Sequence, residues 1–212
     1  MSYTDFKDLD SLKSLGITTI ESVQNLIASE PIEPSLFLIE ALKRFVPLAT
    51  AINTEKARSE YIIAPILSEI AFIDSQVSLF SGRNFNVDAS RGLTGFCDFI
   101  LTHNPDKLRI KAPVVVIVEA KNENINDGLA QCIAEMFAAQ IINQKNLEEN
   151  IETVYGIVTT GQVWRFLSID KTQQVKVDLN EHYLTPINEL LGILTSITSI
   201  PNRNASHPIV EF

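Results

Sequence analysis

The chain has 212 residues, of which 45% are hydrophobic and 20% are charged, and its formal net charge is -9 at pH 7. This apolar content is enough for one substantial core and leaves little for a second, so we expect a single domain over residues 1–212. The longest strongly apolar stretch, residues 114–118, is far shorter than the roughly 20 residues that cross a bilayer, and the first residues lack a signal-peptide pattern. We therefore expect a cytoplasmic protein with no membrane partner.

The first part of the chain has helical patterning. Residues 1–53 are expected to form a helical N-terminal segment, because apolar residues recur at helical spacing after the loop that contains Pro31 and Pro34. A longer helix is expected over about residues 54–73, and Pro65 should kink it. Residues 54–180 are expected to form the main body of the domain.

From Val77 the apolar period changes towards two, which is typical of strands. Strands are expected over about residues 77–87, 93–101, 114–121, 153–160 and 162–169. The run 114–118 is continuously apolar and β-branched, as a strand covered on both faces requires, so it should be central. Turn chemistry marks residues 103–107, and a tight hairpin is expected at Thr160 and Gly161.

Two further helices are expected after the central strand. One covers about residues 127–142, and the other, over about 186–199, belongs to a C-terminal helix and tail at 181–212. The order of the elements predicts an α/β fold with a mixed central β-sheet flanked by helices.

Acidic and basic residues stand at the ends of neighbouring expected strands. Because side chains alternate along a strand, Glu119 and Lys121 should point to one side of the central strand and Ala120 to the other. Asp98 lies among apolar neighbours on the preceding strand, where an acid is costly unless it meets a cation or hydrogen-bond donors. A hard cation such as Mg²⁺ would relieve the repulsion between the two carboxylates. Such an ion can activate a water that Lys121 orients, so phosphodiester hydrolysis suits the pattern best.

At these residues the sequence resembles the PD-(D/E)XK nuclease superfamily, whose core is called restriction endonuclease-like. The matching pattern is the strand acid in residues 95–98, then the apolar run 114–118, then the acid-x-lysine triplet 119–121. The similarity covers about residues 55–168. Within it, residues 155–164 resemble a strand pair found near the nuclease domain of type I restriction subunits.

The resemblance implies Mg²⁺ or Mn²⁺ held by Asp98, Glu119 and the backbone carbonyl of Ala120. Glu60 looks like the acid that the family places on the helix before the sheet, and it is a candidate metal ligand. Gln131 looks like the polar residue on the helix after the lysine. The implied activity is nuclease action on DNA or, less often, on RNA, by a homodimer or as a subunit of a larger complex.

The net charge counts against a simple nucleic-acid binder, because affinity for phosphate comes mainly from Lys and Arg. A metal-dependent nuclease needs only a local basic rim, and scattered surface charge is the plainer explanation for each candidate. The candidates are Lys43, Arg44, Lys56, Arg58, Arg83, Arg91, Lys107, Arg109 and Lys111.

Several alternatives stay open at this level. Glu60 competes with Glu69, and Gln131 with Glu135 at i and i+4 would serve equally well as a surface pair. Cys97 stands where the family usually has proline, and from the sequence we expect no recognition or translocase domain. A binding or regulatory subunit of a defence or repair complex, with the nuclease fold but no useful catalysis, is the second hypothesis. A nuclease-fold member that acts on another substrate is the third.

Overall fold

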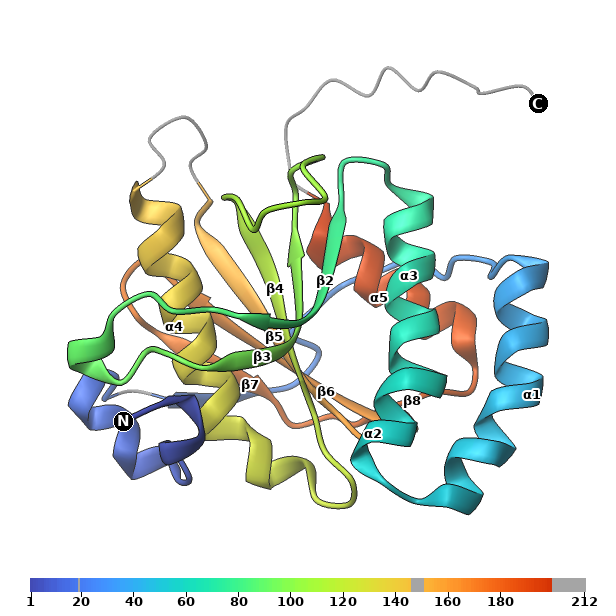
Figure 1. Ribbon diagram of the computed structural model, residues 1–212, viewed down its shortest axis with the longest axis horizontal. Coiled ribbons are helices and arrows are strands. Elements are labelled where there is room, and N and C mark those ends of the chain that lie inside the picture. The colour runs from blue at the N-terminus through green and yellow to red at the C-terminus, as the bar shows by residue number, and fades with distance from the viewer. Residues whose placement is uncertain (19, 146–150, 200–212) are drawn as a thin grey trace.

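The computed structural model describes residues 1–18, 20–145 and 151–199, and its centre is a twisted β-sheet (Figure 1). The strands are β1 (Ile20–Val23), β2 (Ser78–Asn84), β3 (Phe96–Thr102), β4 (Val114–Ala120), β5 (Thr153–Thr159), β6 (Val163–Asp170), β7 (Val175–Asp178) and β8 (His182–Tyr183). They form an eight-stranded sheet in the order β1-β7-β6-β5-β4-β3-β2, and β8 pairs with β6. The pairs β1/β7 and β4/β5 are parallel and the other pairs are antiparallel, so the predicted mixed sheet is confirmed.

Helices cover both faces of this sheet, as predicted (Figure 1). The α-helices are α1 (Leu36–Ile52), α2 (Glu55–Arg58), α3 (Ala64–Ile73), α4 (Leu129–Lys145) and α5 (Ile187–Thr198). Short 3-10 helices span Tyr3–Asp5, Leu9–Leu15, Ala89–Arg91 and Ile125–Gly128. The helix α4 and the first two 3-10 helices lie on one face, whereas α1, α3 and α5 lie on the other. Within the described residues, no helix is both long enough and apolar enough to span a bilayer.

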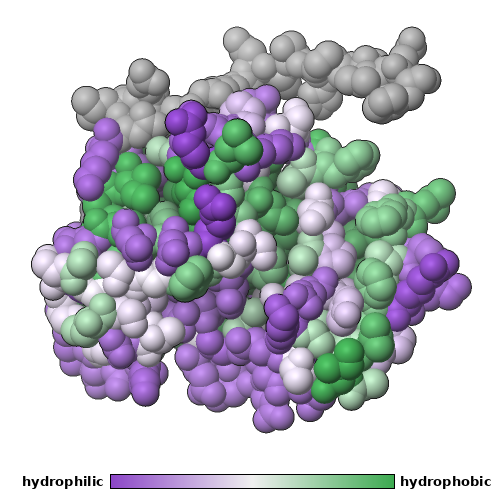
Figure 2. All heavy atoms as spheres, in the orientation of Figure 1, coloured by the Kyte–Doolittle hydropathy of each residue, from purple (hydrophilic) through white to green (hydrophobic). Residues whose placement is uncertain are grey.

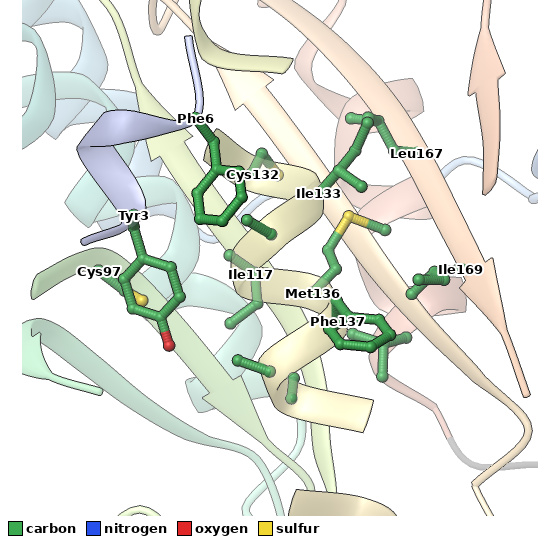
Figure 3. Close-up of a cluster of buried hydrophobic side chains, with 14 of the residues drawn as sticks. Tyr3, Phe6, Cys97, Ile117, Cys132, Ile133, Met136, Phe137, Leu167 and Ile169 are labelled. Carbon is green, nitrogen blue, oxygen red and sulfur yellow. The ribbon is translucent and has the colours of Figure 1, made fainter. Parts of the chain in front are cut away.

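The core has two parts, one on each face of the sheet. On the α4 face, Met136 and Phe137 pack against Ile117 from β4 and Ile169 from β6 (Figure 3). On the opposite face, the fully buried Trp164 lies at the centre of the second cluster. All seven positions of β4 are buried, which agrees with its continuous apolar sequence. Burial of each large apolar side chain stabilises the fold by about 1.5–3 kcal/mol. The central strand is therefore held firmly up to its last residues, Glu119 and Ala120.

The prediction of a helical N-terminal segment over residues 1–53 is wrong in part. Residues Ile20–Val23 form β1, which pairs with β7 in parallel register. The sequence did not predict β7 or β8 either. These strands have two to four residues each, so they owe their conformation to a neighbouring strand more than to a local apolar pattern.

The long helix expected over residues 54–73 is present but interrupted. It consists of α2, a π-helical segment over Ser59–Ile63, and α3. Pro65 lies in the first turn of α3, directly after the π-helical segment. Such segments often accompany functional sites.

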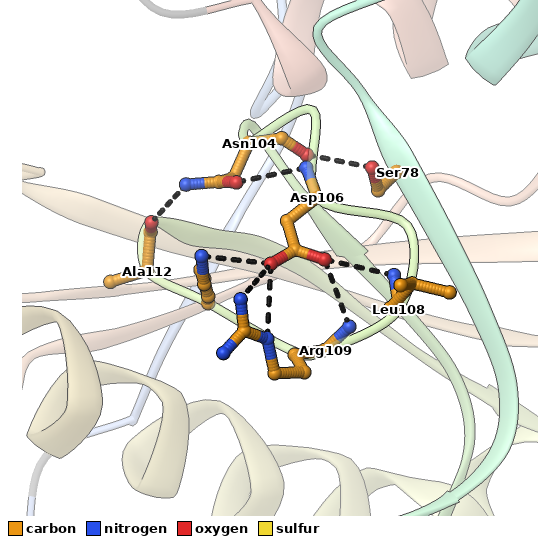
Figure 4. A network of polar contacts seen from close by, with 7 residues as sticks. Ser78, Asn104, Asp106, Leu108, Arg109 and Ala112 are labelled. Atoms are coloured by element: carbon orange, nitrogen blue, oxygen red, sulfur yellow. Dashed lines mark hydrogen bonds and ion pairs between the residues drawn. The ribbon is translucent and has the colours of Figure 1, made fainter.

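The turn expected after β3 is fixed by one carboxylate (Figure 4). Asp106 accepts hydrogen bonds from the backbone N–H groups of Leu108 at 3.0 Å and Arg109 at 3.2 Å. The side chains of Lys111 and Arg109 also pair with it, at 2.8 Å and 3.0 Å. Lys111, the Leu108 N–H and Arg109 hold the pKa of Asp106 well below its usual range. This loop is therefore a structural unit at the end of β3 remote from Asp98.

Candidate active site

Asp98 lies where the backbone pairing between β3 and β4 ends. The last paired residues at this end are Phe99 and Val118. One residue before Phe99, the Oδ2 atom of Asp98 accepts a 2.8 Å hydrogen bond from the backbone N–H of Ala120. Cys97 and Phe99 pack on opposite faces of the sheet, although residues two apart in a regular strand share a face. The strand therefore loses its regular alternation at Asp98, and the acid is fixed to the last residue of the central strand.

Glu119 and Lys121 point the same way, as strand alternation requires. Lys121 Nζ donates a 2.5 Å hydrogen bond to Glu119 Oε1. The Glu119 side chain is only 3% exposed, and its Oε2 atom has no hydrogen-bond partner within the described part of the chain. A buried carboxylate oxygen without a donor is costly, so this atom is suited to a cation or to a proton.

The electrostatics of the three residues are coupled. Burial, followed by the negative charge of Asp98, raises the pKa of Glu119 to about 8, and Lys121 offsets only part of this effect. Burial also raises the pKa of Asp98, against the opposing influence of the Ala120 N–H and Lys121. Burial alone would lower the pKa of Lys121, but the charge of Glu119 and the hydrogen bond to it raise the pKa above the usual lysine value. The charged ammonium form of Lys121 is therefore favoured, which suits a hydrogen-bond donor.

A second helix acid, Glu55, faces the same hollow as Asp98. The hollow has a volume of about 240 Å³, and its lining includes Glu55, Glu60, Asp98 and Ala120. Burial raises the pKa of Glu55, Lys121 lowers it and Asp98 raises it further, so this carboxylate interacts with the whole site. Glu60 lines the hollow too, but it is exposed and its Oε1 atom pairs with Lys56 Nζ at 2.8 Å.

The sequence analysis did not single out Glu55. An acid directly after the Thr54 N-cap is usually explained by its favourable interaction with the helix N-terminus. The sequence could have suggested a site role for Glu55 only because Glu60, the acid singled out, lies on the same helical stretch before Asp98. The charge of Glu55 interacts with Asp98, Glu119 and Lys121, whereas Glu60 pairs with Lys56.

Arg58 attaches α2 to the loops beyond β4 and β5. Its guanidinium donates to Asn122 Oδ1 at 3.3 Å, to the Thr160 carbonyl at 3.2 Å and to Asn53 Oδ1 at 3.0 Å. These bonds use the fixed fork geometry of arginine to hold three segments together. Arg58 thus keeps the helix that carries Glu55 beside the end of the central strand.

Gln131 and Glu135 on α4 do not form a surface pair. Gln131 Nε2 donates to Glu135 Oε1 at 3.1 Å, and Glu135 is completely buried. Burial and the charge of Glu119 raise the pKa of Glu135 well above its usual value, although the Gln131 hydrogen bond opposes the shift. These effects favour the protonated form of Glu135, and Gln131 acts on this acid directly through its hydrogen bond.

The residue before α4 allows the helix to approach the acid-lysine pair. A Cβ atom on Gly128 would lie 3.0 Å from Lys121 Cε, 3.3 Å from Glu119 Cγ and 2.6 Å from Val158 Cγ1. These distances are shorter than ordinary van der Waals contacts, so glycine is required by space. The start of α4 thus confines Glu119 and Lys121 from one side.

The expected basic rim is smaller than the sequence suggested. Lys107, Arg109 and Lys111 follow the far end of β3, and Lys43 and Arg44 belong to α1. Arg91 lies over the Phe137 ring at 4.7 Å and donates to the Leu15 carbonyl. The candidates beside Asp98 are Lys56 and Arg58 on α2 and Arg83 on β2, which pairs with β3.

The residues present suit a divalent cation that keeps water ligands. Across residues 1–18, 20–145 and 151–199, no three His, Cys, Asp or Glu side chains converge closely enough to hold a metal ion by themselves. Mg²⁺, however, is commonly bound through one or two carboxylates and retains several waters. Asp98 and Ala120 line the hollow, and the neighbouring Glu119 has one buried oxygen, Oε2, without a hydrogen-bond partner among the described residues.

No known family model matches the sequence, and no curated protein is significantly similar to it. The function is therefore argued from the geometry of Asp98, Glu119 and Lys121. Their sequence positions predicted a meeting at one edge of the sheet, and hydrogen bonds join Asp98 to Ala120 and Glu119 to Lys121.

Proposed function

We propose that the protein is a Mg²⁺- or Mn²⁺-dependent nuclease that hydrolyses phosphodiester bonds in DNA, with RNA as a further substrate class. The proposal is supported by two hydrogen bonds at the end of the central strand, from the Ala120 N–H to Asp98 and from Lys121 to Glu119, and by the interaction between the charges of the two acids. The proposal agrees with the resemblance to the PD-(D/E)XK superfamily. Under this proposal, the mixed sheet and its flanking helices would correspond to a restriction endonuclease-like core.

Each residue has a defined task in this proposal. Asp98, Glu119 and the backbone carbonyl of Ala120 would hold the ion, with Glu55 or Glu60 contributing through water. When bound, the ion neutralises charge on the phosphate and lowers the pKa of a coordinated water.

The ammonium group and the polar residues of α4 act beside the acids. Lys121, kept protonated by Glu119, would orient the attacking water and stabilise developing negative charge. Gln131 would be a positioning residue, because it donates a hydrogen bond to Glu135, whose charge interacts with that of Glu119.

A cleavage assay tests the proposal directly. Single- and double-stranded DNA and RNA are incubated with the wild-type protein and Mg²⁺ or Mn²⁺, beside the variants Asp98→Ala and Lys121→Ala. Loss of a group that acts on the transition state should lower the rate by about 100-fold or more. The exposed acid Asp10, replaced in Asp10→Ala, is the matched control and should leave the rate unchanged. Full cleavage by both site variants, with circular dichroism showing folded protein, would contradict the proposal.

A non-catalytic binding or regulatory subunit is the second candidate. The direct bond between Lys121 and Glu119 and the raised pKa of Glu119 favour it, because they let the site be neutral without any cation. The net charge of -9 also disfavours strong binding to nucleic acid. Calorimetry separates the candidates, since absence of divalent binding at millimolar metal supports the second.

A further inference from the structure

The helices α1 and α3 carry large apolar side chains on the outer side of the molecule. Their exposed fractions are 85% for Leu36, 78% for Phe37, 79% for Phe72, 46% for Ile39, 44% for Leu48, 46% for Ile52 and 41% for Ile73. Figure 2 shows green apolar groups above and below a purple group along the right-hand edge, where α1 lies in Figure 1. Single exposed apolar residues are ordinary, but a large group of them on adjacent elements marks an interaction surface. We call these seven residues the α1–α3 face.

One buried acid, Glu69, links the start of α1 to α3. Glu69 on α3 accepts hydrogen bonds from the backbone N–H of Ser35 at 2.7 Å and from its hydroxyl at 2.9 Å. Ser35 directly precedes Leu36 and Phe37, and Phe72 follows Glu69 by one helical turn. The first turn of α1 and the last turn of α3 are therefore held side by side, and each carries an exposed aromatic residue, Phe37 and Phe72.

The outward side of α1 is self-complementary. Leu36, Glu40, Arg44 and Leu48 follow each other at intervals of four residues, so they lie along one side of the helix. Arg44 Nε and Glu40 Oε1 form an ion pair of 2.6 Å in the middle of this stripe. An antiparallel second copy, related by a two-fold axis near Leu42, would place Glu40 opposite Arg44 of that copy and Leu36 opposite its Leu48. A two-fold interface requires this kind of reciprocal pairing.

The exposed area is of the size that a stable dimer uses. Given the area of aromatic and aliphatic side chains and the exposed fractions, the α1–α3 face presents about 600–800 Å² per copy. One partner in an interface of standard size buries about 800 Å². The acidic molecule would repel its own copies through its overall charge, but this face carries a balanced ion pair and apolar groups.

We propose that the protein forms a two-fold symmetric homodimer through the α1–α3 face, with Glu40 of each copy paired to Arg44 of the other. This assembly is independent of the proposed nuclease function, because it uses none of the residues at the site. The interface does not include the residues that line the hollow beside Asp98.

Sedimentation velocity on the full chain tests the interface. Wild-type protein should be mainly dimeric at about 100 µM, a concentration well above a micromolar Kd. Phe37→Glu and Leu48→Glu should each raise the dimer Kd by about tenfold or more, since each buries an unpaired charge. Leu108→Glu is the matched control, because Leu108 is 83% exposed in the loop after β3. A monomeric wild type, or equal disruption by Leu108→Glu, would overturn the proposal.

A charge exchange distinguishes a second copy from a different partner. Glu40→Arg and Arg44→Glu each place like charges across the two-fold axis, so each variant alone should be monomeric. An equimolar mixture should form heterodimers, because each variant then faces the opposite charge. Dimers of either single variant, or a mixture that stays monomeric while circular dichroism shows both variants folded, would overturn the reciprocal pairing.

Discussion

Glu119 and Asp98 are acids that the fold keeps close together and largely away from water. Burial and the charge of the neighbouring acid both favour the protonated form of Glu119, and Lys121 compensates only in part. A protonated carboxyl binds a divalent cation only after it releases its proton. At the scale of single residues, metal affinity and pH should therefore be linked.

Metal affinity is predicted to rise with pH. Because the pKa of Glu119 is raised to about 8, the Mn²⁺ association constant should increase by up to tenfold per unit between about pH 6 and about pH 8. Above the pKa it should level off. Calorimetry in two buffers with different heats of ionisation should show about one proton released per ion at neutral pH. Equal affinity at both ends of this range would contradict the coupling.

The buried acid Glu135 gives a second prediction, on stability. Its folded-state pKa is raised well above the usual value, so its contribution to stability is complete below the unfolded pKa and is lost as pH rises. Glu135→Gln imitates the protonated acid and can still accept from Gln131. The variant should match wild type near pH 5 and exceed it by about 1 kcal/mol or more at alkaline pH. Thermal unfolding across this range measures the difference, and the exposed Glu33→Gln is the control.

If Glu135→Gln lowers the melting temperature equally at every pH, the acid is ionised in the folded state. Its buried Oε2 atom would then need a partner that no described residue supplies.

At the scale of elements, the site depends on where strands and helices end. The pairing of β3 with β4 stops at Phe99, which turns Asp98 towards the backbone of Ala120. Arg58 ties α2 to the loop at Asn122, and the start of α4 packs against Lys121. Three elements thus confine the acid-lysine pair.

Gly128→Ala should disturb the site through space alone. The new methyl group would lie 2.6 Å from Val158 and 3.0 Å from Lys121, so we expect a loss of about 1–3 kcal/mol in stability and a weaker Mn²⁺ affinity. Gly156→Ala is the matched control, because its methyl group would collide with Met136 and Cys132 instead. Denaturant unfolding and metal titration measure both effects. An equal loss of affinity in the two variants would show that Gly128 has no particular relation to the site.

The sequence could predict those strands and helices whose own residues show a clear apolar pattern. The run that forms β4 is apolar at nearly every position, and strand alternation correctly gave Glu119 and Lys121 a common direction. It could not predict β1, because four residues beside β7 acquire strand geometry from their neighbour. Glu55 was out of reach, since its importance depends on the rotation of α2 against the sheet. Glu135 was recognised as the i+4 neighbour of Gln131, but the choice between a surface pair and a site role depended on the rotation of α4 against the sheet.

At the scale of the whole molecule, the charge distribution limits how nucleic acid could bind. The net charge is -9, and the cations beside Asp98 are Lys56, Arg58, Arg83 and Lys121. Lys56, Arg58 and Lys121 already have partners in the fold. Only a short stretch of phosphates can therefore be neutralised.

Binding of nucleic acid is predicted to depend weakly on salt. With few phosphate contacts, a plot of log K against log salt concentration should have a slope of about -1 to -3. Fluorescence anisotropy of a labelled oligonucleotide with Asp98→Asn, which should not cleave it, measures the slope. A slope of about -6 or steeper would place the nucleic acid on an extended basic surface away from the hollow.

Calorimetric titration with Mn²⁺ tests most directly whether Asp98 and Glu119 hold a divalent cation together. Wild-type protein should bind one ion per chain, and Asp98→Asn, which can still accept from the Ala120 N–H, should lower the affinity by about tenfold or more. Asp10→Asn should bind as wild type does. No binding by wild type at millimolar Mn²⁺, or an unchanged affinity in Asp98→Asn, would contradict the metal site.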